Sequence, residues 1–173
     1  VSRNDYEAGA ALVDAAPNVV MTRTFSKIHG LAALRLGWAY CPPGVADVLN
    51  RVRGPFNVGA PSQAAGAAAI ADGAFVERAR QETQAALDDF SGRVAAMGLS
   101  APRSVGNFLL VRFPEEPGRN SVAAYDFLVG RRILARRMGG YGLPEALRIS
   151  MASVEDMRFV AESLEAFLAG EKA

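Results

Sequence analysis

The sequence is poor in several features that would point to particular classes of protein. It has one cysteine, Cys41, which excludes an internal disulfide and suits a reducing cytosol. Its longest apolar runs are far shorter than the roughly 18 residues of a membrane-spanning helix. Lysine and arginine number 19 and aspartate and glutamate 18, so the net charge of +1 gives no reason to expect nucleic acid or an anionic membrane as a partner. Small molecules are the expected ligands.

The sequence does contain enough apolar material for a core, arranged as short strands alternating with helices. Half of the 173 residues are hydrophobic, which suffices for one ordinary domain or two small ones. Residues 18–23 and 36–41 are typical of short buried strands, and CPPG closes the second. The segment APSQAAGAAAIAD places Pro61 at a first helical position and then uses mostly small side chains, which favours a helix packed tightly against other backbone.

The second half of the sequence predicts a long helix followed by a mixture of strands and helices. Apolar residues recur at helical spacing from Phe75 to Met97, and Gly98 supplies a stop. Strands are expected in NFLLVRF, RILAR and LRISM, with a helix at 122–129 between the first two. A last helix begins at Ser153 with a start that resembles a capping box. We therefore predict a boundary near residue 73, between part of an α/β layer and a compact α+β unit.

Residues 22–38, TRTFSKIHGLAALRLGW, concentrate polar groups in an otherwise apolar segment. The hydroxyls of Thr24 and Ser26 and the guanidinium of Arg35 are donors of the kind that hold a phosphate. Lys27 lies among them, and a partly desolvated lysine beside a cationic arginine has its neutral form favoured, as condensation with an aldehyde requires. A phosphate and an aldehyde on one small molecule describe pyridoxal 5′-phosphate. The alternative is that Lys27 and Arg35 are ordinary surface charges beside a turn.

The spacing of these residues is more specific than their types. TFSK, then seven residues, then R and LGW resemble the lysine motif of the fold-type I aminotransferases, and GLAALRLGW is similar to the GLAGLRLGY of the histidinol-phosphate aminotransferase family. VRGPFNV, NFLLVRF and GYGLPEALRIS follow in that family's order, so the resemblance covers essentially the whole chain. It implies an α/β, aspartate aminotransferase-like fold. Residues 1–72 would be the C-terminal part of the large cofactor-binding domain, and residues 73–173 the small C-terminal α+β domain.

The resemblance also implies roles for individual residues. Lys27 would bond covalently to pyridoxal 5′-phosphate and, once released, move a proton between the substrate Cα and the cofactor. Thr24, Ser26 and Arg35 would hold the cofactor phosphate. Arg148 in ALRIS would pair with the substrate α-carboxylate, because an amino acid must be held at a fixed bidentate partner for its Cα–H bond to be aligned. No metal is expected.

A second anion site is expected if the substrate carries a phosphate, and ILARRMGG offers the candidate. Adjacent strand residues point to opposite faces, so only one of Arg136 and Arg137 can reach a pocket. The family pattern of two aliphatic residues, a spacer and an arginine favours Arg136. The alternative is that both arginines are solubilising charges at a strand edge.

Taken together, the resemblance implies a cytoplasmic enzyme of histidine biosynthesis that transaminates histidinol phosphate with 2-oxoglutarate. Its partners would be amino acids and keto acids, with no nucleic acid or membrane, and it would be a homodimer because residues 56–58 lie at the subunit interface in relatives. Two alternatives of the same fold are an aromatic amino-acid aminotransferase and a phospho-amino-acid decarboxylase. A third, of another class, is a non-catalytic aminotransferase-like sensing domain of a transcription regulator.

The sequence departs from the family pattern in two respects. Only 26 residues precede Lys27, whereas the family supplies an aspartate for the pyridine nitrogen, an asparagine, a stacking aromatic ring and a phosphate-binding turn upstream of the lysine. The chain is therefore expected to be roughly the C-terminal half of such an enzyme and to be inactive by itself. After Arg148, the common SVGT is replaced by SMAS, which alters the local packing.

Overall fold

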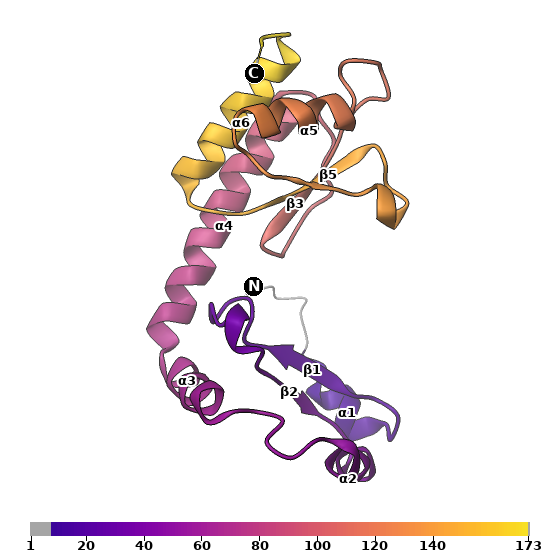
Figure 1. The fold of residues 1–173 in the computed structure, drawn as a ribbon, viewed down its shortest axis with the longest axis vertical. Coiled ribbons are helices and arrows are strands. Elements are labelled where there is room, and N and C mark those ends of the chain that lie inside the picture. Colours follow the sequence, from indigo (N-terminus) through magenta and orange to yellow (C-terminus); the bar gives the residue numbers. More distant parts are fainter. Residues whose placement is uncertain (1–7, 173) are drawn as a thin grey trace. The chain divides into compact units, whose positions relative to one another are not determined.

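Two separate antiparallel sheets organise the chain, one in each of two compact units (Figure 1). The computed structural model describes residues 8–172. Unit 1 ends at Arg80 and unit 2 begins at Gln81, so the division falls inside the 24-residue helix α4 (Gly73–Ala96). The domain boundary predicted near residue 73 lies at the start of this helix.

Unit 1 is built around a two-stranded ladder. Strand β1 (Met21–Thr24) pairs with β2 (Gly37–Tyr40), with Met21 opposite Tyr40 and Thr24 opposite Gly37. The strands predicted at 18–23 and 36–41 are therefore present and shorter than expected, but the prediction that they are buried is wrong, because no residue of either strand is buried. The other elements of unit 1 are α1 (Ala10–Ala15), the 3-10 turn η1 (Ala32–Leu34), α2 (Pro43–Val52) and α3 (Ala60–Ala71).

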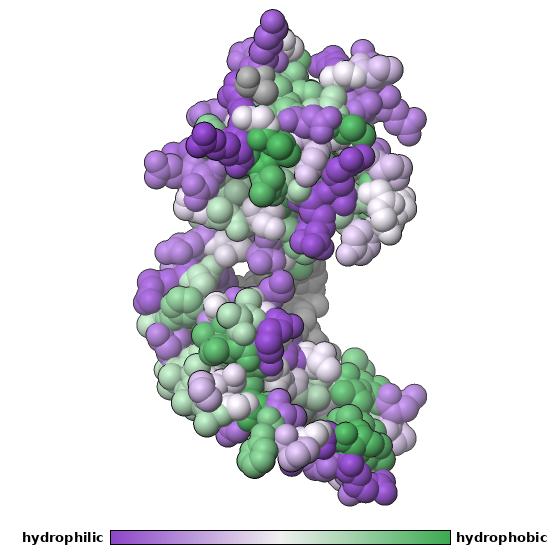
Figure 2. Space-filling model, viewed as in Figure 1, coloured by the Kyte–Doolittle hydropathy of each residue, from purple (hydrophilic) through white to green (hydrophobic). Residues whose placement is uncertain are grey.

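Very little of unit 1 is buried. Among the buried hydrophobic side chains of residues 8–172, only Val13 and Phe25 precede residue 86. Every residue of β2 is exposed, and α2 buries none of its side chains although it is amphipathic. Hydrophobic side chains accordingly lie on the surface over α2 and α3 (Figure 2), among them Val52, which is 72% exposed.

Helix α2 was not predicted from the sequence. The segment CPPG was interpreted only as the end of a strand, but Pro43 occupies the first turn of α2. Proline is well suited to this position because the first N–H groups of a helix have no partner within it. The amphipathic spacing of the following residues was the signal that could have revealed the helix.

Unit 2 is a three-stranded antiparallel sheet with helices on one face (Figure 1). The strand order is β3-β5-β4, so β5 is central. Its core draws side chains from β3, β5, α4, α5 and α6, and the largest that are fully buried are Phe90, Leu109, Leu128, Leu147, Met157 and Leu164. The elements that follow α4 are β3 (Phe108–Arg112), α5 (Ser121–Gly130), β4 (Arg136–Arg137), the 3-10 turn η2 (Gly139–Tyr141), β5 (Ala146–Ser150) and α6 (Val154–Leu168).

The ends of the predicted helices in unit 2 are where the sequence placed them. Ser153 is the N-cap of α6, and its Oγ accepts a hydrogen bond from the Asp156 N–H at 3.0 Å. The Ser153 hydroxyl also donates to the Asp156 carboxylate at 2.7 Å, which differs from the reciprocal bond of a standard capping box. After α4, Gly98 adopts a φ of +76°, a conformation that glycine reaches at little cost.

The strand predicted in RILAR is largely wrong. Only Arg136–Arg137 is a strand, because the residues before it complete the C-terminal end of α5 instead. The Ile133 N–H donates to Leu128 O at 2.8 Å, and Arg132 adopts a φ of +63°. These hydrogen bonds satisfy helix carbonyls that would otherwise have no partner, so the extended segment begins later than apolar alternation suggested.

Candidate cofactor and substrate sites

The predicted cofactor residues lie where the β1-β2 ladder ends. Thr24 is opposite Gly37, and the Phe25 N–H donates to Leu36 O at 3.0 Å, which extends the same register by one residue. Ser26 and Arg35 are the next residues beyond this bond, one on each side of the connection between the strands. The hairpin therefore places Thr24, Ser26 and Arg35 at one end of the ladder, although 8 residues separate Ser26 from Arg35 in the sequence.

Lys27 begins a tight turn at this end of the hairpin. The Gly30 N–H donates to Lys27 O at 2.9 Å, and Gly30 has a φ of +69°, which favours glycine. The Lys27 side chain is exposed, in contrast to the partial desolvation expected from the sequence. Within residues 8–172 its amine has neither a carboxylate nor another hydrogen-bond partner. The turn thus presents a primary amine on the surface of unit 1.

The two hydroxyl residues before Lys27 are held in a local turn. Thr24 Oγ1 accepts a hydrogen bond from the Ser26 N–H at 3.0 Å, so the Thr24 side chain has a defined position. A hydroxyl can accept and donate at the same time, and the Thr24 proton is still available to an anion. Between them, Phe25 is buried and packs against His29 with ring centroids 4.9 Å apart. The buried Phe25 is the anchor of the loop.

Arg35 adopts a backbone conformation that is unusual for a residue with a side chain. Its φ and ψ are 49° and 46°, in the left-handed region, where a non-glycine residue costs about 1–3 kcal/mol. Its side chain is exposed, and Nη1 donates to Ala32 O at 2.9 Å. That bond uses one of five guanidinium donors, so the others can reach a ligand. Strain of this kind is often found in loops that bind ligands.

Helix α3 contacts the two residues on either side of Arg35, which the sequence did not reveal. Ser62 Oγ donates to Leu34 O at 3.0 Å. Gly66 lies against Leu36 so closely that an added Cβ would be 2.3 Å from Leu36 Cδ2 and 3.8 Å from the Phe25 ring. The run of small residues in APSQAAGAAAIAD was the available signal, and it predicted close packing without identifying what α3 packs against.

The residues at the end of the hairpin fit pyridoxal 5′-phosphate. Two hydroxyls and a guanidinium with unused donors suit a phosphate, and a primary amine suits an aldehyde. Within residues 8–172, no carboxylate forms an ion pair with Lys27 or Arg35 and competes for the anion. The donor set is therefore chemically suitable for this cofactor, which is bound through an amine and a phosphate.

In unit 2, the arginines predicted to bind substrate lie side by side on the central and edge strands. Arg148 of β5 is directly opposite Arg136 of β4, and on its other side it is opposite Leu110 of β3. Opposite residues of antiparallel strands point to the same face, so the two arginines share the sheet face away from the core. Like charges in this position repel each other, and within residues 8–172 neither has an ion-pair partner. This face is therefore suited to an anion.

Arg137 lies on the other face of the sheet. It is opposite Leu147, a core residue, and its guanidinium carbon is 5.8 Å from the centre of the Tyr125 ring of α5. The alternation that separates Arg136 from Arg137 was expected from the sequence. The structure thus places Arg136, and not Arg137, beside Arg148.

Phe108 also belongs to the open face of this sheet and was not singled out from the sequence. The Arg148 guanidinium carbon lies 5.2 Å from the centre of the Phe108 ring, within the range of a cation–π contact. Arg148 Nε is buried without a hydrogen-bond partner among the described residues. The alternation of β3, in which Leu109 and Val111 enter the core, could have placed Phe108 on the same face as Arg148.

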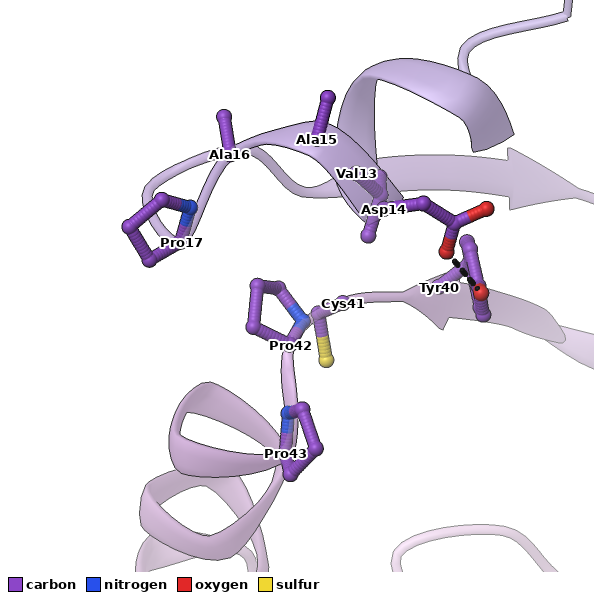
Figure 3. A pocket seen from close by; sticks show the side chains of 9 residues that line it. All are labelled: Val13, Asp14, Ala15, Ala16, Pro17, Tyr40, Cys41, Pro42 and Pro43. Atoms are coloured by element: carbon purple, nitrogen blue, oxygen red, sulfur yellow. Dashed lines mark hydrogen bonds between the residues drawn. The ribbon is translucent and has the colours of Figure 1, made fainter.

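The pocket shown in Figure 3 lies elsewhere in unit 1. It has a volume of about 360 Å³ and is lined by residues of α1, the end of β2 and the start of α2, and none of the predicted site residues lines it. Asp14 accepts a hydrogen bond from the Tyr40 hydroxyl at 2.5 Å, and this bond and the negative charge of Asp14 raise the pKa of Tyr40. The pocket therefore has its own polar pair, separate from the hairpin end that carries Lys27.

Two other features are absent from residues 8–172. No group of three or more histidine, cysteine, aspartate or glutamate side chains there is placed to hold a metal ion. None of the helices in this range combines the length and the apolar character needed to cross a membrane.

Comparisons with known proteins agree with the motifs. The family model of aminotransferase class I and II matches residues 1–164. The chain is 51% identical over 168 residues to histidinol-phosphate aminotransferase of Paramagnetospirillum magneticum, covering 97% of this chain and 46% of that protein. It is 53% identical over 170 residues to the enzyme of the same name from Rhodospirillum centenum, covering 98% of this chain and 47% of that protein. The chain thus spans about half the length of the curated relatives it matches.

Solved structures give the same family and fold. The structure of histidinol-phosphate aminotransferase from Sinorhizobium meliloti in complex with pyridoxal-5′-phosphate matches with a TM-score of 0.79 and 29% identity, over 89% of this chain and 42% of that one. The fold is therefore the α/β fold of the fold-type I, aspartate aminotransferase-like enzymes. With the family model matching nearly its whole length, the chain belongs to the class I and II aminotransferase family.

Proposed function

We propose that this chain is part of a pyridoxal 5′-phosphate-dependent aminotransferase that transfers the amino group of histidinol phosphate to 2-oxoglutarate in histidine biosynthesis. The observation that carries the proposal is the end of the β1-β2 hairpin, where Thr24, Ser26 and Lys27 follow one another as the chain leaves β1 and Arg35 lies just before β2. The relatives named histidinol-phosphate aminotransferase, at 51% and 53% identity, support this substrate.

In this proposal unit 1 binds the cofactor. Thr24 and Ser26 donate neutral hydrogen bonds to the phosphate, and Arg35 adds a charge-assisted bond. Lys27 would hold the cofactor through its amine, and its Nζ would accept the proton of the substrate Cα and return it. When bound, pyridoxal 5′-phosphate supplies the aldehyde and an electron sink that weakens the Cα–H bond.

In this proposal unit 2 recognises the substrate. Arg148 binds the α-carboxylate of glutamate or 2-oxoglutarate with two parallel donors, which fixes the direction of the glutamate Cα–H bond. Phe108 supports the guanidinium from one side, at 5.2 Å. Arg136, directly opposite Arg148, binds the phosphate of histidinol phosphate. Histidinol phosphate has no carboxylate, so its phosphate dianion would neutralise the two arginines that lie opposite each other on β4 and β5.

The alternatives differ in what they require of Arg136. An aromatic amino acid offers only the single negative charge of its α-carboxylate, whereas the phosphate of histidinol phosphate is a dianion that can pair with a second arginine beside Arg148. A phospho-amino-acid decarboxylase would also use an anion site, but the relatives at 51% and 53% identity are named as aminotransferases. A sensing domain that binds cofactor without turnover receives no support from these relatives.

The assembly and location are part of the same proposal. We place the enzyme in the cytoplasm as a homodimer, supported by the single cysteine and by the loop that follows α2. Phe56 in that loop is 94% exposed and has a φ of +55°. An exposed aromatic ring on a strained backbone is the kind of residue that a second subunit would cover.

Borohydride reduction followed by peptide mass analysis tests the proposal. The chain has only two lysines, Lys27 and Lys172, so the lysine that carries the reduced cofactor can be identified directly. In the chain extended to the full length of its relatives, we expect the adduct on Lys27 and its loss in Lys27→Ala. Lys172→Ala is the matched control and should retain both the adduct and the visible absorption of the bound cofactor. An adduct on any lysine other than Lys27 would contradict the proposal.

A further inference from the structure

Helix α3 is joined to the Arg35 turn at two points that are one helical turn apart. Ser62 Oγ donates to Leu34 O at 3.0 Å, on the N-terminal side of Arg35. Gly66 packs against Leu36, on the C-terminal side, with room for no further atom between them unless Leu36 moves. Residues four apart share one face of a helix, so a single face of α3 contacts both neighbours of Arg35.

Arg35 needs this support because its conformation is not one that an arginine adopts freely. Its left-handed backbone persists only where the surrounding structure determines it. The bond from Nη1 to Ala32 O stays within the turn, so it cannot fix the turn relative to the rest of unit 1. The Ser62 bond can, because it connects the turn to a 12-residue helix that is distant in the sequence.

We infer that Ser62 is a positioning residue for Arg35 and that α3 thereby determines where the guanidinium presents its donors to a phosphate. The inference rests on the proposed function, in which Arg35 binds the cofactor phosphate. Ser62 acts through the carbonyl of Leu34 and not on the ligand itself. Gly66 contributes by keeping α3 close enough for the Ser62 bond to form.

A comparison of pyridoxal 5′-phosphate with pyridoxal tests the inference, since pyridoxal lacks only the phosphate. The dissociation constants of both are measured by fluorescence titration on the chain extended to the full length of its relatives. Because one hydrogen bond is removed, Ser62→Ala should raise the dissociation constant of pyridoxal 5′-phosphate about fivefold and that of pyridoxal less than about twofold. A purely structural role for Ser62 would weaken both ligands alike.

Three further variants make the result specific. Gln63→Ala removes a bond of the same type from the neighbouring residue of α3, the bond from Gln63 Nε2 to Val58 O at 2.8 Å. It should leave unchanged the ratio of the dissociation constant of pyridoxal 5′-phosphate to that of pyridoxal. Ser62→Thr keeps a hydroxyl and should restore the ratio, whereas Ser62→Val has nearly the same shape without the hydroxyl and should not. The comparison of Ser62→Thr with Ser62→Val also tests the inference in the case that Ser62→Ala folds poorly.

A double-mutant cycle connects the two residues. Arg35→Ala should raise the ratio of the constants more than Ser62→Ala does, and adding Ser62→Ala to Arg35→Ala should change it no further. If Arg35→Ala raises the ratio but Ser62→Ala does not, the positioning role is wrong and the proposed function stands. If Arg35→Ala leaves the ratio unchanged, Arg35 does not bind the phosphate, and both the inference and that part of the proposed function fail.

Discussion

Units 1 and 2 both carry candidate site residues but support them in different ways. In unit 2, Arg148 stands on the central strand of a sheet whose other face is covered by a core of 19 buried residues in the chain segment 86–167. In unit 1, Lys27 and its neighbours stand at the end of a two-stranded ladder, and only Phe25 anchors the loop among buried apolar residues. Two-stranded sheets are at best marginally stable by themselves.

The residues proposed to bind the cofactor therefore lie in the unit with little buried core, and those proposed to bind the substrate lie in the unit with a large one. The residues proposed to bind the cofactor depend on local turns, on one buried ring and on α3, whereas the residues proposed to bind the substrate depend on a closed core. The stability of unit 1 should therefore depend on other polypeptide that covers its surface, whereas the stability of unit 2 should not. The predictions below test this contrast, beginning with the largest expected effect.

The largest effect concerns activity. We expect the 173-residue chain alone to show no measurable transamination of histidinol phosphate, because it spans about half the length of its relatives, and the resemblance implies that the partners of the cofactor ring and of its nitrogen lie in the other half. Adding the segment that completes the length of its relatives, as a second polypeptide, should restore some activity. The measurement is 2-oxoglutarate-dependent turnover with and without that polypeptide. Full activity of the chain alone would contradict the proposal that unit 1 depends on the segment that completes the length of the relatives.

The second prediction concerns stability, and the single tryptophan makes it accessible. Trp38 is on β2, so its fluorescence reports on unit 1, whereas most of the far-UV circular dichroism comes from the helices of the chain as a whole. Removing the Phe90 ring with Phe90→Ala should lower the free energy of unfolding of unit 2 by about 3–5 kcal/mol, since the ring is fully buried. Urea denaturation should show a large shift in circular dichroism and little shift in Trp38 fluorescence.

The control for this experiment is the exposed Val52→Ala, which should change neither transition measurably. In the wild-type chain, Trp38 fluorescence should change at a lower urea concentration than circular dichroism, because two probes coincide only when a protein unfolds as one unit. Coincident transitions that shift together in Phe90→Ala would show that the two units are one cooperative structure.

The same contrast explains how much of the structure the sequence could predict. Helices α4, α5 and α6 and strands β3 and β5 were found because apolar residues alternate or recur where a core exists to receive them. Helix α2 was not, because none of its side chains is buried among the described residues, and the strand around Arg136 begins later than predicted because the residues before β4 serve as the cap of α5. Periodicity reports burial, and it gives little information where burial is small.

The residues of the candidate site could likewise be predicted only in part. The motif spacing identified Lys27, Thr24, Ser26 and Arg35 as a group, because a hairpin brings the two ends of its connection together. Contacts from other elements could not be predicted, among them the bond from Ser62 to Leu34 and the ring of Phe108 beside Arg148. They depend on which faces of α3 and β3 are turned toward the loop and the arginine, and only tertiary packing decides this.

The third prediction concerns Arg148, in the well-supported unit. Arg148→Lys in the full-length enzyme should lower kcat/KM by a factor on the order of one hundred or more, because lysine keeps the charge but lacks the two parallel donors. The dissociation constant of the cofactor should not change, because the proposed cofactor residues all belong to unit 1. An equal loss of cofactor affinity would mean that Arg148 has a structural role.

The fourth prediction separates the two neighbouring arginines of β4. Arg136→Ala should weaken the binding of histidinol phosphate about tenfold or more and that of phenylalanine much less, because only the former offers a phosphate dianion to the guanidinium. Arg137→Ala is the matched control, since Arg137 lies over the Tyr125 ring on the other face of the sheet. Substrate specificity constants measure both effects. If both substrates are weakened equally by Arg136→Ala, the phosphate is bound elsewhere.

The smallest effect is the pH dependence of unit 1 at its polar pair. The hydrogen bond to Asp14 and its negative charge raise the pKa of Tyr40 above the value near 10 that is usual for tyrosine. The stabilisation from this bond is therefore fully present below pH 10 and is lost as the pH rises through the raised pKa of the folded state. Because the pair is exposed to solvent, we expect only a slight change in the Trp38 transition.

Ultraviolet absorption of the phenolate measures this titration directly. The difference between the wild-type chain and Tyr40→Phe isolates the Tyr40 signal from those of the other three tyrosines. In Asp14→Asn the hydrogen bond can persist but the negative charge is removed, so the midpoint of the Tyr40 titration should move to lower pH. An identical midpoint in both proteins would show that the Asp14 contact is not maintained in solution. Unit 1 would then lack one of the few side-chain contacts that connect α1 to its two-stranded ladder.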